Sequence, residues 1–137
     1  MRVPTLATVV IALLAPMGIA EGGGGAQKPH LDVRVTPRTG FSPVEVLFTA
    51  EIVGGMDLED YHCPQIEWNW DDGDRSVHES DCTPYQPGVE IERHFTARHL
   101  FRREGVYNVK ISMLRAARPI ARASARVSIL SGLGDMQ

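Results

Sequence analysis

The stretch that decides the fold is Glu67-Trp68-Asn69-Trp70-Asp71-Asp72-Gly73-Asp74. Its first half alternates bulky apolar and polar side chains, which is typical of a β-strand with one buried face. The Asp72-Gly73 pair that follows is a turn signal, because glycine adopts positive φ without a Cβ clash. The stretch therefore predicts a β-hairpin with Trp68 and Trp70 on its buried face.

The same alternation recurs along most of the chain. It predicts strands over 31–36, 44–52, 66–70, 75–78, 89–95, 107–113 and 121–129. Segments rich in proline, glycine and polar residues separate these strands, with turns at 37–40, 102–105 and 116–119 and loops at 56–64 and 79–88. About seven short strands without a helical period or an internal repeat predict one all-β domain over residues 31–130. The expected architecture is an immunoglobulin-like β-sandwich of two antiparallel sheets.

The first twenty residues have the pattern of an export signal. Arg2 precedes an apolar run over 6–14, and small residues end the segment at Ala20. We expect cleavage after Ala20, with Ala26 as the alternative, leaving residues 21–30 as a flexible glycine-rich leader. The apolar run is too short for a permanent anchor, so we expect no membrane span after cleavage. The protein is therefore expected to be secreted or periplasmic, with residues 131–137 as a short tail.

The charge balance narrows the class of partner. The 137 residues include 14 basic and 17 acidic side chains, a formal net charge of −3. No run of lysine or arginine suggests a nucleic-acid or membrane-surface footprint. We therefore expect no nucleic-acid partner.

Two cysteines, Cys63 and Cys82, are expected to pair in an oxidising compartment. A bridge between them would close a loop of about 20 residues, which the chain-entropy model values at roughly 3 kcal/mol. Zinc is the competing interpretation, since His62 and His78 lie nearby. The spacing lacks the Cys-x-x-Cys and His-x-x-x-His elements of zinc sites, so a disulfide is preferred and no metal is expected.

The hairpin block and a second block downstream resemble the signature of the polycystic kidney disease (PKD) domain family. That signature is Trp-Asp-Phe-Gly-Asp-Gly, then His-x-Tyr, then Gly-x-Tyr-x-Val. The residues at the matching positions are Trp68, Trp70, Asp72, Gly73, His99, Phe101, Gly105, Tyr107 and Val109. The stretch Pro37–Pro43 also resembles the start of such domains. The resemblance covers residues 31–130 and implies a non-catalytic β-sandwich module of an extracellular protein.

Three positions depart from the family pattern. Asn69 replaces an aspartate, which keeps the ability to cap a turn, and Asp71 replaces a glycine, which puts the turn backbone in question. Phe101 lacks the hydroxyl of the usual tyrosine. The loops that carry Cys63 and Cys82 are an insertion relative to a minimal domain of this kind.

No catalytic residue and no cofactor are expected. The serines at 42, 76, 80 and 112 lack a Gly-x-Ser-x-Gly elbow, and the resemblance makes His99 structural. Asp71, Asp72 and Asp74 offer oxygen ligands for Ca²⁺, but without the Asp-x-Asp-x-Asp-Gly spacing a solvated turn is the preferred interpretation.

The expected function is binding to another molecule rather than catalysis. Trp68 and Trp70 are expected in the core rather than on a stacking platform, since they share a face with Ile66. Tyr61 and Tyr85 are the candidate contact residues, weighed against ordinary loop tyrosines. We expect a non-catalytic module that contacts a protein or glycan at the cell envelope. The alternatives are an assembly protein that pairs through an open sheet edge, or an accessory module of a secreted hydrolase system.

Overall fold

The structure is a computed structural model, and it describes residues 28–133. The expected signal peptide, most of the expected leader and the last four residues of the expected tail lie outside this range. Within residues 28–133, no helix is long and apolar enough to cross a membrane.

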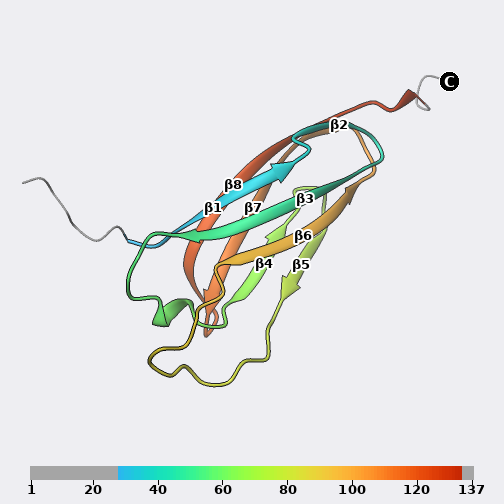
Figure 1. The fold of residues 1–137 in the computed structure, drawn as a ribbon. Helices are drawn as coiled ribbons and strands as arrows, with labels where there is room; N and C mark the ends of the chain where they lie inside the picture. Colours follow the sequence, from blue (N-terminus) through green and yellow to red (C-terminus); the bar gives the residue numbers. More distant parts are fainter. Residues whose placement is uncertain (1–27, 134–137) are drawn as a thin grey trace, which may run out of the picture.

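Eight strands form two facing sheets, which confirms the predicted all-β sandwich (Figure 1). One sheet has three strands in the order β1-β3-β6, and the other has five in the order β2-β8-β7-β4-β5. The elements are β1 (His30–Thr36), β2 (Thr39–Phe41), β3 (Val44–Val53), the 3-10 helix η1 (Glu59–Tyr61), β4 (Gln65–Asn69), β5 (Arg75–His78), β6 (His94–Phe101), β7 (Gly105–Arg115) and β8 (Arg118–Leu130).

The core lies between the two sheets and is built by period-two burial. Along β3 and β7 every second side chain is buried while its neighbours face outward or lie half-buried. The largest fully buried side chains are Trp70, Phe48, Phe101, Ile52, Ile66, Ile111 and Met113. Trp68 is also buried, with 2% of its surface exposed, so both indole rings lie where the alternation predicts them.

Strand β2 corrects the predicted turn at 37–40. Residues Thr39–Phe41 form a short strand that pairs in parallel with residues 128–130 of β8. The chain thus has eight strands rather than about seven, and the five-stranded sheet is not wholly antiparallel. Pro37 lacks a backbone N–H and cannot continue the β1 ladder, so the chain crosses here from one sheet to the other.

The predicted strand over 89–95 is also wrong in its bounds. Strand β6 begins only at His94 and continues to Phe101, while residues 89–93 have no strand structure. These residues belong to a long connection that crosses from β5 in one sheet to β6 in the other. Ile91 still packs against the core, so the apolar alternation records burial without a hydrogen-bonded ladder.

The turn between β7 and β8 is tighter than the predicted 116–119 segment. It consists of Ala116 and Ala117, whose φ angles of 48° and 62° are both left-handed. Two-residue hairpin turns with two positive φ angles normally carry asparagine and glycine, because a Cβ is strained in this region.

Candidate functional site

The aromatic residues of the signature form one stack inside the sandwich. The rings of Trp68 and Trp70 are parallel, with centroids 5.4 Å apart. The ring of His99 also stacks on Trp70, with centroids 4.4 Å apart. Phe48 of β3 packs against Trp70 from the facing sheet at 5.2 Å. These rings therefore hold the two sheets together and do not form an open stacking platform.

The turn after β4 is fixed by Asn69 and Asp71, two of the residues that depart from the family pattern. Asp71 has a φ of 64°, so it adopts the left-handed conformation that a glycine would adopt without strain. Its backbone N–H donates to Asn69 Oδ1 at 3.1 Å, and its own carboxylate accepts a bond from the Asn108 N–H at 2.9 Å. Asp71 thus ties the turn to β7, and the hairpin is formed despite the missing glycine.

Asp72 and His99 join the hairpin turn to β6. Asp72 Oδ2 lies 2.6 Å from His99 Nε2, and Asp72 Oδ1 accepts a bond from the Asp74 N–H at 3.0 Å. Burial raises the pKa of Asp72, but the bond from His99 and the bond from the Asp74 N–H outweigh it. The net result is a pKa below the ordinary value of 3.8, which keeps the carboxylate ionised for these bonds.

Tyr107 closes the cluster on the side of β7. Its hydroxyl donates to the Arg103 carbonyl at 2.8 Å, and its ring packs against Phe101 with centroids 4.6 Å apart. Burial, reinforced by the negative charge of Asp72, raises the pKa of Tyr107 above 10.0. The phenol therefore stays protonated and anchors the turn before β7, while the nearby Val109 is fully buried.

Ligand atoms of Asp72, Asp74 and His99 lie within 4.8 Å of one another, which is close enough to hold an ion. Asp71, considered with them from the sequence, is bonded to the Asn108 N–H instead. The His99–Asp72 bond accounts for the closeness of two of these three groups. Ca²⁺ takes six to eight oxygen ligands, and the described residues supply far fewer here.

Two serines, Ser76 and Ser80, are bonded to an aromatic ring nitrogen. Ser76 Oγ accepts a bond from Trp70 Nε1 at 2.8 Å, which satisfies the buried indole. Ser80 Oγ lies 3.2 Å from His78 Nε2, but both residues are exposed. Among residues 28–133, no carboxylate is bonded to His78 to orient it as a triad would require.

The predicted disulfide is present and fastens the long connection after β5. Cys63 and Cys82 are bonded across a sequence separation of 19. Beside it, His62 Nε2 lies 2.7 Å from the Thr83 carbonyl, and the His62 ring meets the edge of Tyr85 at 5.6 Å. The bridge therefore holds residues 80–85 against the end of the sandwich.

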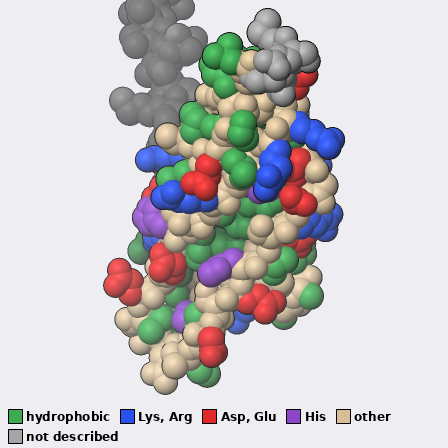
Figure 2. Space-filling view, turned by 90° about the vertical axis from the view of Figure 1, so that its right-hand side faces the viewer, with side chains coloured by type: hydrophobic (Ala, Val, Ile, Leu, Met, Phe, Trp, Pro, Cys, Tyr) green, Lys and Arg blue, Asp and Glu red, His purple; other side chains and the backbone are tan. Residues whose placement is uncertain are grey.

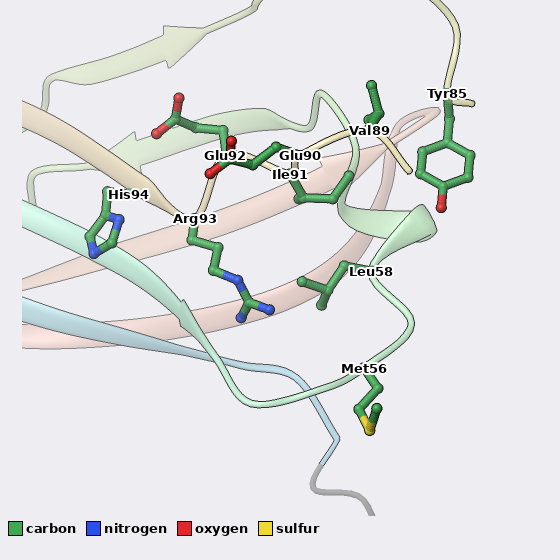
Figure 3. Close-up of a pocket in the computed structure, with 9 residues that line it drawn as sticks. All are labelled: Met56, Leu58, Tyr85, Val89, Glu90, Ile91, Glu92, Arg93 and His94. Carbon is green, nitrogen blue, oxygen red and sulfur yellow. The ribbon is translucent and has the colours of Figure 1, made fainter. Parts of the chain in front are cut away.

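This fastening leaves an open groove of about 770 Å³, which we call the end groove (Figure 3). It lies between the loop after β3 and the segment that leads into β6. Its lining residues are Met56, Leu58, Tyr85, Val89, Glu90, Ile91, Glu92, Arg93 and His94. Met56 is 92% exposed and Val89 40%, so apolar surface faces the solvent here.

The far wall of the end groove is braced by Arg93. Its guanidinium donates to the carbonyls of Ile52 and Gly54, both at 3.2 Å, and the Ile52 N–H donates to the Arg93 carbonyl at 2.9 Å. The charge of Arg93 is thereby directed at backbone oxygens. Glu90 and Glu92 are exposed, so the polar rim of the groove is acidic.

The two candidate tyrosines have different environments. Tyr85 is half-buried and lines the end groove. Tyr61 is half-buried, packs against the core and donates its hydroxyl to the Ile120 carbonyl at 3.4 Å. Sequence reasoning missed Met56, an apolar residue within a predicted loop, and it missed Val89 because the alternation there placed Val89 in a strand.

Neither a protein-family model nor a curated protein matches this chain. Among solved structures, it is similar to the PKD domain of an M14-like peptidase from Thermoplasmatales archaeon SCGC AB-540-F20, with a TM-score of 0.53 and 12% identity over 76% of this chain and 97% of that one. It is also similar to a CARDB domain from Pyrococcus furiosus, with a TM-score of 0.43 and 12% identity over 76% and 96%. At this identity the likeness is one of fold: the chain has a PKD-like, immunoglobulin-like β-sandwich.

Proposed function

We propose that this protein is an exported, non-catalytic contact module that binds another protein at the cell envelope through its end groove. The observation that carries the proposal is the groove itself, where exposed apolar side chains stand on a loop fastened by a disulfide. A loop that is already held in place loses little conformational entropy on binding, so less of the free energy gained from its contacts is spent on ordering it.

The chemistry of the end groove indicates the partner. Met56 and Tyr85 are residue types enriched at protein interfaces, and Met56 adapts to irregular apolar surfaces. Glu90 and Glu92 add negative charge at the rim. The matching partner surface is an apolar side chain flanked by lysine or arginine, which favours a protein over a glycan for this groove.

Export is the second part of the proposal. The expected signal segment at 1–20 and the Cys63–Cys82 disulfide both fit a secreted or periplasmic protein. Non-reducing mass spectrometry of the protein recovered from the medium or periplasm tests this. We expect a chain that begins at Glu21 and carries no free thiol; a full-length chain retained in the cytoplasm would contradict export.

Site-specific photo-crosslinking in the producing cell tests the end groove. A crosslinker at Met56 is expected to capture a discrete protein adduct, and Val89→Asp is expected to abolish that adduct. The matched control is a crosslinker at Val106, which is 54% exposed and lies at the start of β7. Equal capture from both positions, or an adduct that survives Val89→Asp, would rule out the groove as the binding site.

A second candidate, assembly through open sheet edges, is favoured by the gap between β5 and β6. Each of these strands pairs on one side only, and a hollow of about 250 Å³ between them is lined in part by Ile66, Trp68 and Phe95. Figure 2 shows hydrophobic side chains along this face, bordered by charged ones. An added strand would satisfy both edges. Light scattering tests it: oligomers are expected, and a strictly monomeric profile removes this candidate.

A further inference from the structure

Three cations share the outer face of β7 and β8, and we call them the basic face: Lys110, Arg122 and Arg126. In the strand register Lys110 lies opposite Ser124, while Arg122 and Arg126 lie opposite the two neighbours of Lys110 on the same face. Each arginine is thus diagonal to Lys110, at a separation of about 7–8 Å in an antiparallel pair. All three side chains are exposed, and within residues 28–133 none of them takes part in an ion pair.

The outer face of the other sheet is arranged differently. There Arg34 pairs with Glu51, and Arg98 pairs with Glu45 at 3.2 Å. His94 also lies 3.3 Å from Glu51. On that sheet each arginine has a carboxylate partner. On the basic face Glu67 of β4 lies opposite Ser112, but its carboxylate is paired with Arg75 at 3.0 Å, so within residues 28–133 the three cations have no ion-pair partner.

Fold stability does not explain the basic face. Like charges on neighbouring strands repel, which lowers stability by a few tenths of a kcal/mol for each close pair. The separation of Lys110 from each arginine is also no larger than the screening length of about 8 Å at physiological ionic strength, so Lys110 adds to the positive field at both arginines. The chain as a whole is acidic, with a net charge of −3. The positive charge on this face is therefore a local excess and does not reflect the overall composition.

The side chains between the cations on β7 and β8 are small and polar. Asn108, Ser112 and Ser124 stand between them, and a shallow hollow of about 480 Å³ is lined by Lys110, Ser112, Arg122 and Ser124. No aromatic or large apolar side chain points outward from residues 108–112 or 122–126. A protein interface needs such a residue at its centre, and a membrane surface needs one to insert.

We propose that the basic face binds a carboxylated polysaccharide. The cations would pair with carboxylates on different sugars of one chain, since Arg122 and Arg126 are about 13 Å apart along one strand, which is longer than a single sugar. The serine and asparagine side chains would exchange hydrogen bonds with sugar hydroxyls. The surface is separate from the end groove, so a chain with both could link a polysaccharide to a protein.

Binding of polygalacturonate oligosaccharides to the full mature protein tests this, with calorimetry at several salt concentrations. We expect binding that weakens as salt rises. The triple variant Lys110→Gln, Arg122→Gln, Arg126→Gln should bind roughly tenfold more weakly, since each exposed charge contact is worth up to about 1 kcal/mol. Its melting temperature should be unchanged or slightly higher.

The matched control is Arg34→Gln, Arg98→Gln, Arg102→Gln, which removes the same charge from β1, β6 and the turn after β6. This variant should keep the wild-type affinity, and an equal loss would show that net charge rather than the basic face is responsible. Neutral dextran should not bind. Tighter binding of a poly-glutamate peptide or of duplex DNA than of polygalacturonate would overturn the polysaccharide assignment.

Chemical-shift mapping on the wild-type protein keeps the proposal testable if the triple variant fails to fold. Polygalacturonate should shift the backbone amides of residues 108–112 and 122–126. The amides of β1, β3 and β6 should stay unshifted. Shifts centred on the other sheet, or no shifts at low salt, would overturn the proposal.

Discussion

The imidazole of His99 lies flat against the indole of Trp70, with ring centroids 4.4 Å apart and an angle of 4° between the planes. Its Nε2 atom is held 2.6 Å from Asp72 at the same time. His99 of β6 is thereby held by two parts of the β4–β5 hairpin: the buried Trp70 and the turn residue Asp72. The contact explains why a histidine, and not another planar residue, suits this position.

Asp72→Asn is expected to destabilise the protein in a pH-dependent way. The pKa of Asp72 is lower in the folded state, so its contribution is fully present above about pH 3.8 and is lost as the pH falls below that value. Urea unfolding should show a larger difference between wild type and variant at pH 7 than at pH 2.5. Asp81→Asn, which changes an exposed loop carboxylate, is the control. An equal difference at both pH values would contradict the ionic role of Asp72.

Tyr107→Phe should lower the free energy of unfolding by about 1 kcal/mol at pH 7, because the Arg103 carbonyl loses its hydroxyl partner. The pKa of Tyr107 is higher in the folded state, so its contribution is present below pH 10 and is lost as the pH rises further. The difference from wild type should therefore shrink above pH 10. Denaturant titrations at pH 7 and pH 11 measure it, and a constant difference would be evidence against the raised pKa.

Replacing Ala116 by Asn and Ala117 by Gly should stabilise the β7–β8 hairpin. Both alanines have left-handed φ angles, which cost L-residues roughly 1–2 kcal/mol each. Part of the gain is offset by the greater freedom of glycine in the unfolded chain, so we expect about 1 kcal/mol. Thermal melts measure the gain. Ala123→Gly, inside β8, should have the opposite effect, and a shared direction for both variants would refute the turn argument.

The double variant Cys63→Ser, Cys82→Ser should lose about 3 kcal/mol, the loop-closure value for a bridge of this span. The tryptophans are buried in the core, so their fluorescence should stay native-like in the folded variant. The end groove should become more open to hydrogen exchange at residues 83–92, because its fastening is gone. Unchanged exchange there would show that the hydrogen bonds of His62 and Arg93 suffice.

Much of this fold could be predicted from the sequence because a strand with one buried face shows alternating apolar and polar residues. Trp68 and Trp70 alternate with polar residues and are both buried, and the two cysteines pair as expected. The same alternation was misleading over residues 89–93, which form no strand: Ile91 packs against the core, whereas Val89 is exposed.

The remaining features depend on contacts between distant segments. Nothing local marks Thr39–Phe41 as a strand, because its partner in β8 lies about 90 residues further on. The end groove likewise forms only when the disulfide and Arg93 bring two loops together. The basic face needs the β7–β8 register, since Lys110 and Arg122 are 12 positions apart and are not a charged run. Sequence spacing alone carries none of these relationships.

The parallel pairing of β2 with β8 also determines how the molecule responds to mechanical load. The Ser128 N–H donates to the Arg38 carbonyl and the Ser42 N–H donates to the Leu130 carbonyl, both at 2.9 Å. The described chain ends leave from opposite ends of the sandwich (Figure 1). Tension between the two ends pulls these parallel strands in opposite directions along their length. The bonds are then sheared together rather than unzipped one by one, so the domain can transmit force between whatever is attached to its ends.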